Sequence, residues 1–121
     1  MVEIPVTTMP IFKLPIHISY VVYLSMLSSR LAQFYLNLSL TMCDMTGIEP
    51  SLLMHPLDFL GSDDNIPELA FFPGMRMSSE KKMKIVSESL DLLTQKFNVI
   101  TMKQHALAVG QQSPFPVLGL R

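Results

Sequence analysis

The prediction of the fold rests on one short apolar run, Ser51-Leu52-Leu53-Met54-His55-Pro56. The run has the length of a β-strand and follows a long segment with helical periodicity, a pattern that favours a buried parallel strand. Pro56 ends the run, because proline has no N–H to donate to a neighbouring strand. The run therefore predicts an α/β fold and places His55 at the C-terminal end of a strand, where α/β folds carry catalytic and ligand groups.

The residues before this run predict a long amphipathic helix over about 19–45. Apolar residues recur there in steps of three and four, which places them on one stripe of a helix: Tyr20, Leu24, Leu27, Leu31, Phe34, Leu38, Met42 and Met45. Gly47 is suited to the left-handed conformation that ends helices. Because helix propensity falls at Ser28-Ser29, two helices joined at this point are an alternative.

The residues after the run predict a long loop, a second helix and a further strand. Residues 57–77 are rich in glycine, proline and aspartate but also carry large apolar side chains, so we expect this loop to pack against the protein. A second amphipathic helix begins near Ser78 or Ser79. Its predicted buried stripe is Met83, Val86, Leu90, Leu93 and Phe97. Strands are also predicted over 3–8 and 98–102, and one or two helical turns over 103–109.

This alternation of strands and helices predicts a parallel sheet with crossover helices. Three short strands would leave two sheet edges unpaired, which is typical of a fragment of a barrel or of a larger sheet. The chain also opens within the first predicted strand. We therefore expect residues 1–109 to be part of a larger domain and residues 110–121 to form a tail.

Composition excludes several classes of function. Of the 121 residues, 49% are hydrophobic and 16% are charged, which excludes a disordered chain. A net charge of -1 gives no electrostatic basis for binding nucleic acid. The single cysteine, Cys43, has no partner for an internal disulfide, and we expect a buried thiol.

No targeting or membrane-spanning segment is predicted. The first six residues lack the basic and apolar regions of a signal peptide, which leaves the compartment open, with the cytoplasm as the default. Arg30, Gln33 and Asn37 interrupt the apolar segment 16–45 before it reaches the ~20 apolar residues of a membrane span. A small membrane-associated protein built on this segment is kept as a third alternative for the function.

The three histidines are the main candidates for chemistry. His55 is either catalytic or a hydrogen-bonded histidine at a strand–loop junction. Asp58 is placed either to bond His55 and fix its tautomer or to cap a turn, and His17 either to bond a loop carbonyl or to cap the first helix. We expect His105 to be solvated. No two histidines have the spacing of a metal site, so no metal ligand is predicted in this chain.

One stretch resembles a known family: Glu49-Pro50-Ser51-Leu52-Leu53-Met54-His55-Pro56-Leu57-Asp58-Phe59-Leu60-Gly61. It is similar to the last motif of the polysaccharide deacetylase family (the nodulation-deacetylase homology domain), in which a strand with Leu-x-His ends in the active site. Residues 3–10, 15–20, 69–75 and 97–102 resemble one branch of the same family. The resemblance covers residues 2–108 and implies the C-terminal fragment of a distorted (β/α) barrel, with short parallel strands and two long amphipathic helices.

The resemblance also implies an activity, the metal-dependent hydrolysis that removes N-acetyl groups from amino sugars or glycans. In the family, a divalent metal, usually zinc, and an aspartate base activate water, and the late histidine protonates the departing amine. Carried over to this chain, His55 is the catalytic acid or oxyanion stabiliser. Leu53, which would line the pocket for the acetyl methyl group, Asp58 and His17 are the predicted substrate-binding residues.

The chain departs from the family in one respect. The metal-binding aspartate, the His-x-x-x-His pair and the catalytic aspartate have no copy in it. The resemblance therefore implies that the chain holds no cofactor, is inactive alone and needs a missing N-terminal half of the same domain as its partner. The alternative is a non-catalytic interaction module that pairs with another chain through exposed apolar faces.

Overall fold

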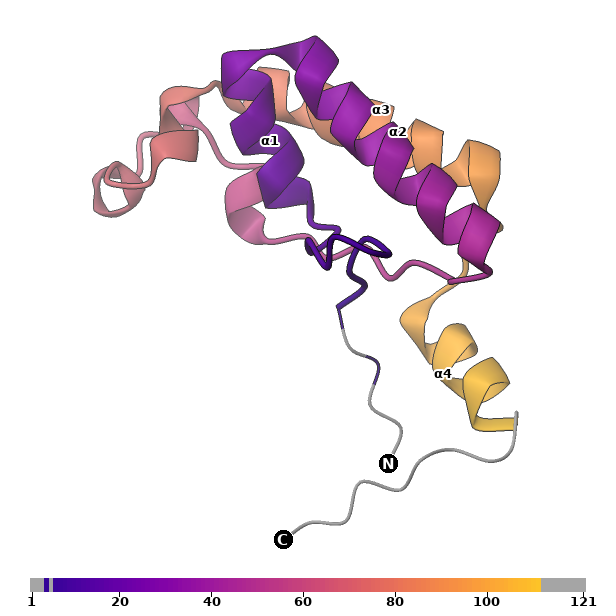
Figure 1. Ribbon diagram of the computed structural model, residues 1–121. Helices are drawn as coiled ribbons and strands as arrows, with labels where there is room; N and C mark the ends of the chain where they lie inside the picture. Colours follow the sequence, from indigo (N-terminus) through magenta and orange to yellow (C-terminus); the bar gives the residue numbers. More distant parts are fainter. Residues whose placement is uncertain (1–3, 5, 112–121) are drawn as a thin grey trace, which may run out of the picture.

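The computed structural model describes residue 4 and residues 6–111, and this part of the chain is helical (Figure 1). The four α-helices are α1 (Ile18–Leu27), α2 (Ser29–Thr46), α3 (Ser79–Lys96) and α4 (Met102–Gln111). Four short 3-10 helices connect α2 to α3, namely η1 (Pro56–Asp58), η2 (Ser62–Asp64), η3 (Pro67–Leu69) and η4 (Pro73–Arg76). Helices α1, α2 and α3 all contact one another, whereas α4 extends away from them (Figure 1).

The predicted α/β barrel fragment with short parallel strands is wrong. Helix accounts for 64% of the structure, and the described residues contain no strand or sheet. Pairing of the β type is limited there to two isolated bridges, Thr8 with Pro15 and His17 with Leu53. A proline stands at each end of the 51–55 run and interrupts any ladder. Leu53 and Met54 are 36% and 40% exposed, so the run also lacks the burial that a central parallel strand requires.

The other predicted strands do not form either. Residues 98–101 are not a strand but lead into α4, which is longer than the predicted one or two turns and reaches Gln111. In the 3–8 segment, residues 3 and 5 lie outside the described residues, and Thr8 forms a single bridge. Most of the predicted tail, residues 112–121, also lies outside the described residues.

The helix ends follow local rules that the sequence does reveal. Two helices meet at Ser28, whose backbone N–H closes α1 and whose side chain accepts a bond from the Leu31 N–H at the start of α2. Gly47 has a φ of 68° and ends α2 in the left-handed conformation. Ser78 caps α3 by accepting a bond from the Lys81 N–H. The predictions for these three positions are confirmed.

The core lies between α1, α2 and α3, but it uses a different face of α2 from the predicted stripe. The buried residues of α2 are Ala32, Leu36, Ser39, Leu40 and Cys43. The predicted stripe lies on the outer side, where Phe34 is 64% exposed and Met45 is 81% exposed. Because α2 is apolar around most of its circumference, periodicity alone does not identify the side that faces the core.

Helix α3 confirms part of its predicted stripe. Val86 and Leu93 are buried, and Phe97 and Leu90 are partly buried against the core. The prediction that Met83 is buried is wrong, because Met83 is 52% exposed.

No helix in the described part of the chain combines the length and apolarity that crossing a bilayer demands.

Candidate functional site

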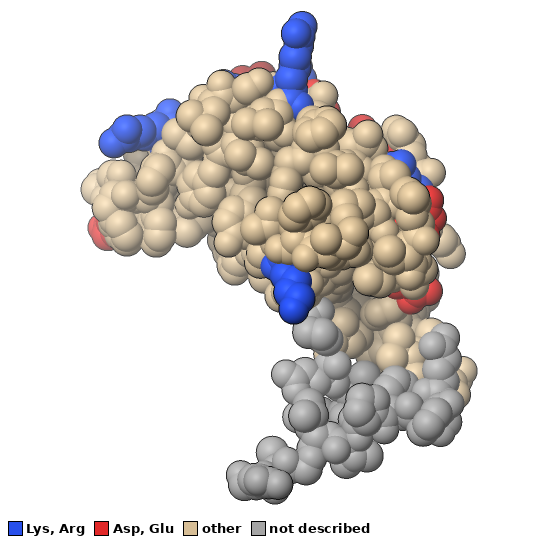
Figure 2. All heavy atoms as spheres, in the orientation of Figure 1, with Lys and Arg blue, Asp and Glu red and all other residues tan. Residues whose placement is uncertain are grey.

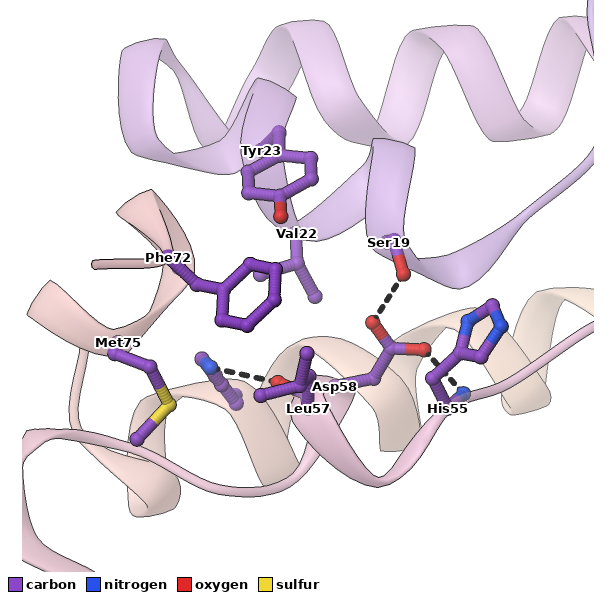
Figure 3. Close-up of a pocket in the computed structure, with 10 residues that line it drawn as sticks. Ser19, Val22, Tyr23, His55, Leu57, Asp58, Phe72 and Met75 are labelled. Atoms are coloured by element: carbon purple, nitrogen blue, oxygen red, sulfur yellow. Dashed lines mark hydrogen bonds between the residues drawn. The ribbon is translucent and has the colours of Figure 1, made fainter. Parts of the chain in front are cut away.

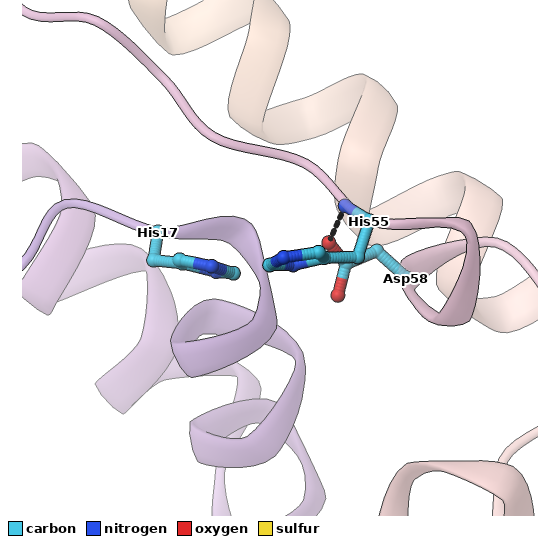
Figure 4. Close-up of side chains that lie close together, drawn as sticks. All are labelled: His17, His55 and Asp58. Atoms are coloured by element: carbon cyan, nitrogen blue, oxygen red, sulfur yellow. Dashed lines mark hydrogen bonds between the residues drawn. The ribbon is translucent and has the colours of Figure 1, made fainter. Parts of the chain in front are cut away.

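Three side chains that are distant in sequence meet where α1 begins and η1 ends. His17 precedes α1, His55 precedes η1, and Asp58 is the last residue of η1. The imidazole rings of His17 and His55 have centroids 4.7 Å apart and planes inclined by 23°. Figure 4 shows the two rings extending toward each other from their separate segments, with Asp58 beside His55. The structure thus brings together three of the four residues that the sequence singled out.

Asp58 holds the loop of His55 in place through both carboxylate oxygens. Its Oδ1 accepts a 2.5 Å bond from the Ser19 hydroxyl, and its Oδ2 accepts a 2.7 Å bond from the backbone N–H of His55. The carboxylate is almost fully buried, with 2% of the residue exposed. Of the two roles predicted for Asp58, the bonds fit the turn cap, because they reach the backbone of His55 and not its ring.

His17 caps α1 and is held in one tautomer. Its Nδ1 accepts a 3.1 Å bond from the Ser19 N–H, so the proton of the neutral ring is on Nε2. Burial lowers the pKa of His17, the nearby His55 lowers it further, and the Asp58 carboxylate partly offsets both effects. The bond to Nδ1 leaves the Nε2–H of His17 as the ring's donor beside His55. Its predicted role as a helix cap is confirmed.

The same three residues are also the described residues with the geometry nearest to a metal site. One ligand atom from each lies within 4.8 Å of the others. Zinc bonds of about 2.0–2.1 Å place tetrahedral ligands only ~3.3 Å apart, so the three groups would have to move closer. His17 would also have to release its cap on α1 before Nδ1 could bind an ion. As arranged, the group is a histidine pair beside a carboxylate that is committed to hydrogen bonds.

A small cavity of about 190 Å³ opens beside His55 and Asp58. Its wall is mostly apolar and comes from α1, η1 and η4, and its larger members are Val22, Tyr23, Leu57, Phe72 and Met75. Figure 3 shows Phe72 and Tyr23 on one side of this space and the bonded group of Ser19, Asp58 and His55 at its other end. The cavity has the size and polarity to take a small acyl group next to the imidazole of His55.

Lys82 lines this cavity and was not anticipated from the sequence. It is 1% exposed, and its ammonium donates a 2.7 Å bond to the Leu57 carbonyl and a second bond to the Leu60 carbonyl. Burial lowers the pKa of Lys82, while Asp58, Asp64 and Asp63 raise it in part. The signal was its place on the buried stripe of α3, three and four residues before Ile85 and Val86.

Two predicted residues lie apart from the cavity. The backbone carbonyl of Leu53 accepts a 3.2 Å bond from the Ile18 N–H, and Leu53 is not one of the residues that line the cavity. His105 is half-buried, not solvated as predicted, and its Nδ1 lies 3.3 Å from Oε2 of Glu49.

No protein-family model, curated protein or solved structure matches the chain. The residues around His55 and the family resemblance of the 49–61 stretch are therefore the features of this chain that bear on its function.

Proposed function

We propose that this chain is the C-terminal portion of a polysaccharide-deacetylase-like hydrolase, in which His55 protonates the amine that leaves an N-acetylated amino sugar. One observation carries the proposal. The exposed imidazole of His55 stands at the edge of a small apolar cavity, on a loop that Asp58 holds in place. The resemblance of the 49–61 stretch to the last motif of the family supports the same assignment.

Hydrolysis of an N-acetyl amide requires a proton donor for the leaving amine. When water has added to the acetyl carbonyl, the C–N bond breaks only as the nitrogen gains a proton, and an imidazolium is suited to supply it near neutral pH. The proton moves from His55 to the amine nitrogen, and acetate is the other product. The ring of His17 stacks beside His55 and keeps its Nε2–H as a donor, and the cavity takes the acyl methyl group.

The metal of the family, when bound, polarises the acetyl carbonyl and the attacking water. The residues of this chain do not fit that role as they stand, because the sequence has no His-x-x-x-His pair and the ligand atoms of His17, His55 and Asp58 are committed or too far apart. In the proposal, the ligands come from an N-terminal portion of the same domain.

Binding to the chain alone gives a first test. N-acetylglucosamine is titrated into the ¹⁵N-labelled protein while the imidazole resonances are followed. We expect shifts at His55 and His17, with His105 as an internal control because it lies apart from the cavity. If the three histidines respond alike or not at all, the proposed acyl site is wrong.

Activity gives the second test. The genomic DNA upstream of the Met1 codon is read for an in-frame segment that encodes a His-x-x-x-His pair, and the longer product is assayed for acetate release from chitooligosaccharides. We expect His55→Ala to lower kcat by about 10²–10⁴-fold, and His105→Ala to leave it unchanged. If the His55→Ala product were as active as the unchanged protein, His55 would not be the proton donor.

A second function, that of an interaction module, is favoured by one specific observation. Helix α2 leaves Phe34 and other large apolar side chains on its outer face. This face is compatible with either function.

A further inference from the structure

The outer face of α2 carries an apolar stripe that no segment in the described part of the chain covers. The stripe consists of Leu31, Phe34, Leu38 and Met45, which are 45%, 64%, 38% and 81% exposed. Steps of three, four and seven residues are those of the seam in a coiled coil. Figure 2, in the orientation of Figure 1, shows a broad surface with few charged atoms on the side where α2 lies.

The only two charged residues of α2 stand at its opposite ends. Arg30 lies in the first turn and Asp44 in the last turn, and both are exposed. Each is at the unfavourable end, because the N-terminus of a helix carries partial positive charge and the C-terminus partial negative charge. Neither is in an ion pair with any residue that the structure describes. Arg30 lines a groove together with Glu88 and Asp91 of α3 but forms no ion pair there, so the side chains of Arg30 and Asp44 can both pair with a charge from another molecule.

We propose that α2 pairs with α2 of a second copy of this chain, in antiparallel orientation around a twofold axis at Asn37. Residues 30, 37 and 44 are seven apart and occupy one flanking position of the coiled-coil repeat, from which interhelical ion pairs form. Reversal about Asn37 brings Arg30 of one copy to Asp44 of the other. The twofold axis repeats this ion pair, so the interface contains it twice.

The apolar stripe fits the same register. With flanking residues paired as 30 with 44, Phe34 lies within one helical turn of Leu38 of the other copy, and Leu31 within one turn of Thr41. The charges at 30, 37 and 44 are positive, neutral and negative, so in an antiparallel pair each end of the helix meets the opposite charge. A parallel pair would place Arg30 next to the second Arg30, so the charges favour the antiparallel arrangement.

The test is the oligomeric state of the chain and of its charge-reversed variants, measured by sedimentation velocity over a range of concentrations. We expect a dimer that Arg30→Asp or Asp44→Arg alone weakens by about tenfold or more, because each change creates two like-charge contacts. The double variant Arg30→Asp/Asp44→Arg restores the pairs and should restore the dimer. This rescue is specific to an antiparallel interface.

Phe34→Glu tests the apolar seam and should weaken the dimer by about a hundredfold, because the twofold axis buries this aromatic residue twice. Phe34 is 64% exposed, so the fold should persist, which circular dichroism checks. Leu107→Glu, at a 59% exposed position of α4, is the matched control. A monomer at all concentrations, open-ended aggregation or a dimer insensitive to both charge reversals would overturn the proposal. Any of these results leaves the proposed chemistry of His55 untouched.

Discussion

The hydroxyl of Ser19 donates a 2.5 Å hydrogen bond to Oδ1 of Asp58, and this bond joins the first turn of α1 to the loop that carries His55. The second oxygen of Asp58 accepts the backbone N–H of His55. One buried carboxylate therefore fixes the distance between two segments that are 39 residues apart in the chain. The position of His55 beside His17 depends on this link.

Removal of the Asp58 carboxylate should destabilise the fold. Asp58→Ala leaves the Ser19 hydroxyl and the His55 N–H without their acceptor, and we expect a loss of about 2–4 kcal/mol in the free energy of unfolding. Asp58→Asn keeps one acceptor and should lose about 1 kcal/mol. Urea unfolding measures both, with the exposed Asp91→Ala as the control. Equal stability of Asp58→Ala and the wild type would mean that these bonds do not hold the loop.

Lys82→Met should be destabilising although methionine fills a similar volume. The change removes the ammonium group that donates to the backbone carbonyls of Leu57 and Leu60. Each buried carbonyl that loses its hydrogen-bond donor costs about 1–3 kcal/mol. We expect a lower midpoint of urea unfolding with an unchanged slope. Lys84→Met, at an exposed position of the same helix, should change stability by less than about 0.5 kcal/mol. A more stable Lys82→Met variant would refute this role.

The two glycines Gly61 and Gly47 should respond differently to alanine. A Cβ at Gly61 would lie 2.2 Å from the backbone nitrogen of Ser79, so the loop would have to move away from the start of α3. At Gly47 a Cβ meets no atom within 4 Å, and only the left-handed backbone opposes it, at about 1–2 kcal/mol. Thermal unfolding should therefore show a clearly lower Tm for Gly61→Ala than for Gly47→Ala. The reverse order would contradict the packing of this loop.

The local features of the fold were predictable, and its class was not. Ser28, Gly47 and Ser78 act through bonds within a few residues, so their chemistry is visible in the sequence. The 51–55 run has the composition of a strand, but strand pairing depends on a distant partner. His17 supplies only one bridge to Leu53, and no ladder follows. Tertiary context thus overrode a local preference.

The candidate site shows the same division. The proximity of His55 and Asp58 was predictable because they are three residues apart, but the sequence left open whether Asp58 bonds the ring or the backbone of His55, and the structure shows the backbone bond. The approach of His17 depends on how α1 packs, and the burial of Lys82 depends on two carbonyls of a loop far from it in sequence. A lysine on an otherwise apolar stripe is the one sequence feature that indicates such a buried contact.

Acid should weaken the contact between η2 and α3. The Ser79 hydroxyl and then the Ser79 N–H, both bonded to Asp63, lower the pKa of that carboxylate below its ordinary value of 3.8. Because the folded-state pKa lies below the unfolded one, the stabilisation is complete above about pH 4–5 and is lost as the pH falls through the folded-state value. We expect Asp63→Asn to lower Tm at pH 7 and to approach the wild type in acid. Asp91→Asn, which changes an exposed carboxylate of α3, is the control. A difference between wild type and Asp63→Asn that does not change from pH 7 to pH 2 would show that charge on Asp63 does not hold this contact.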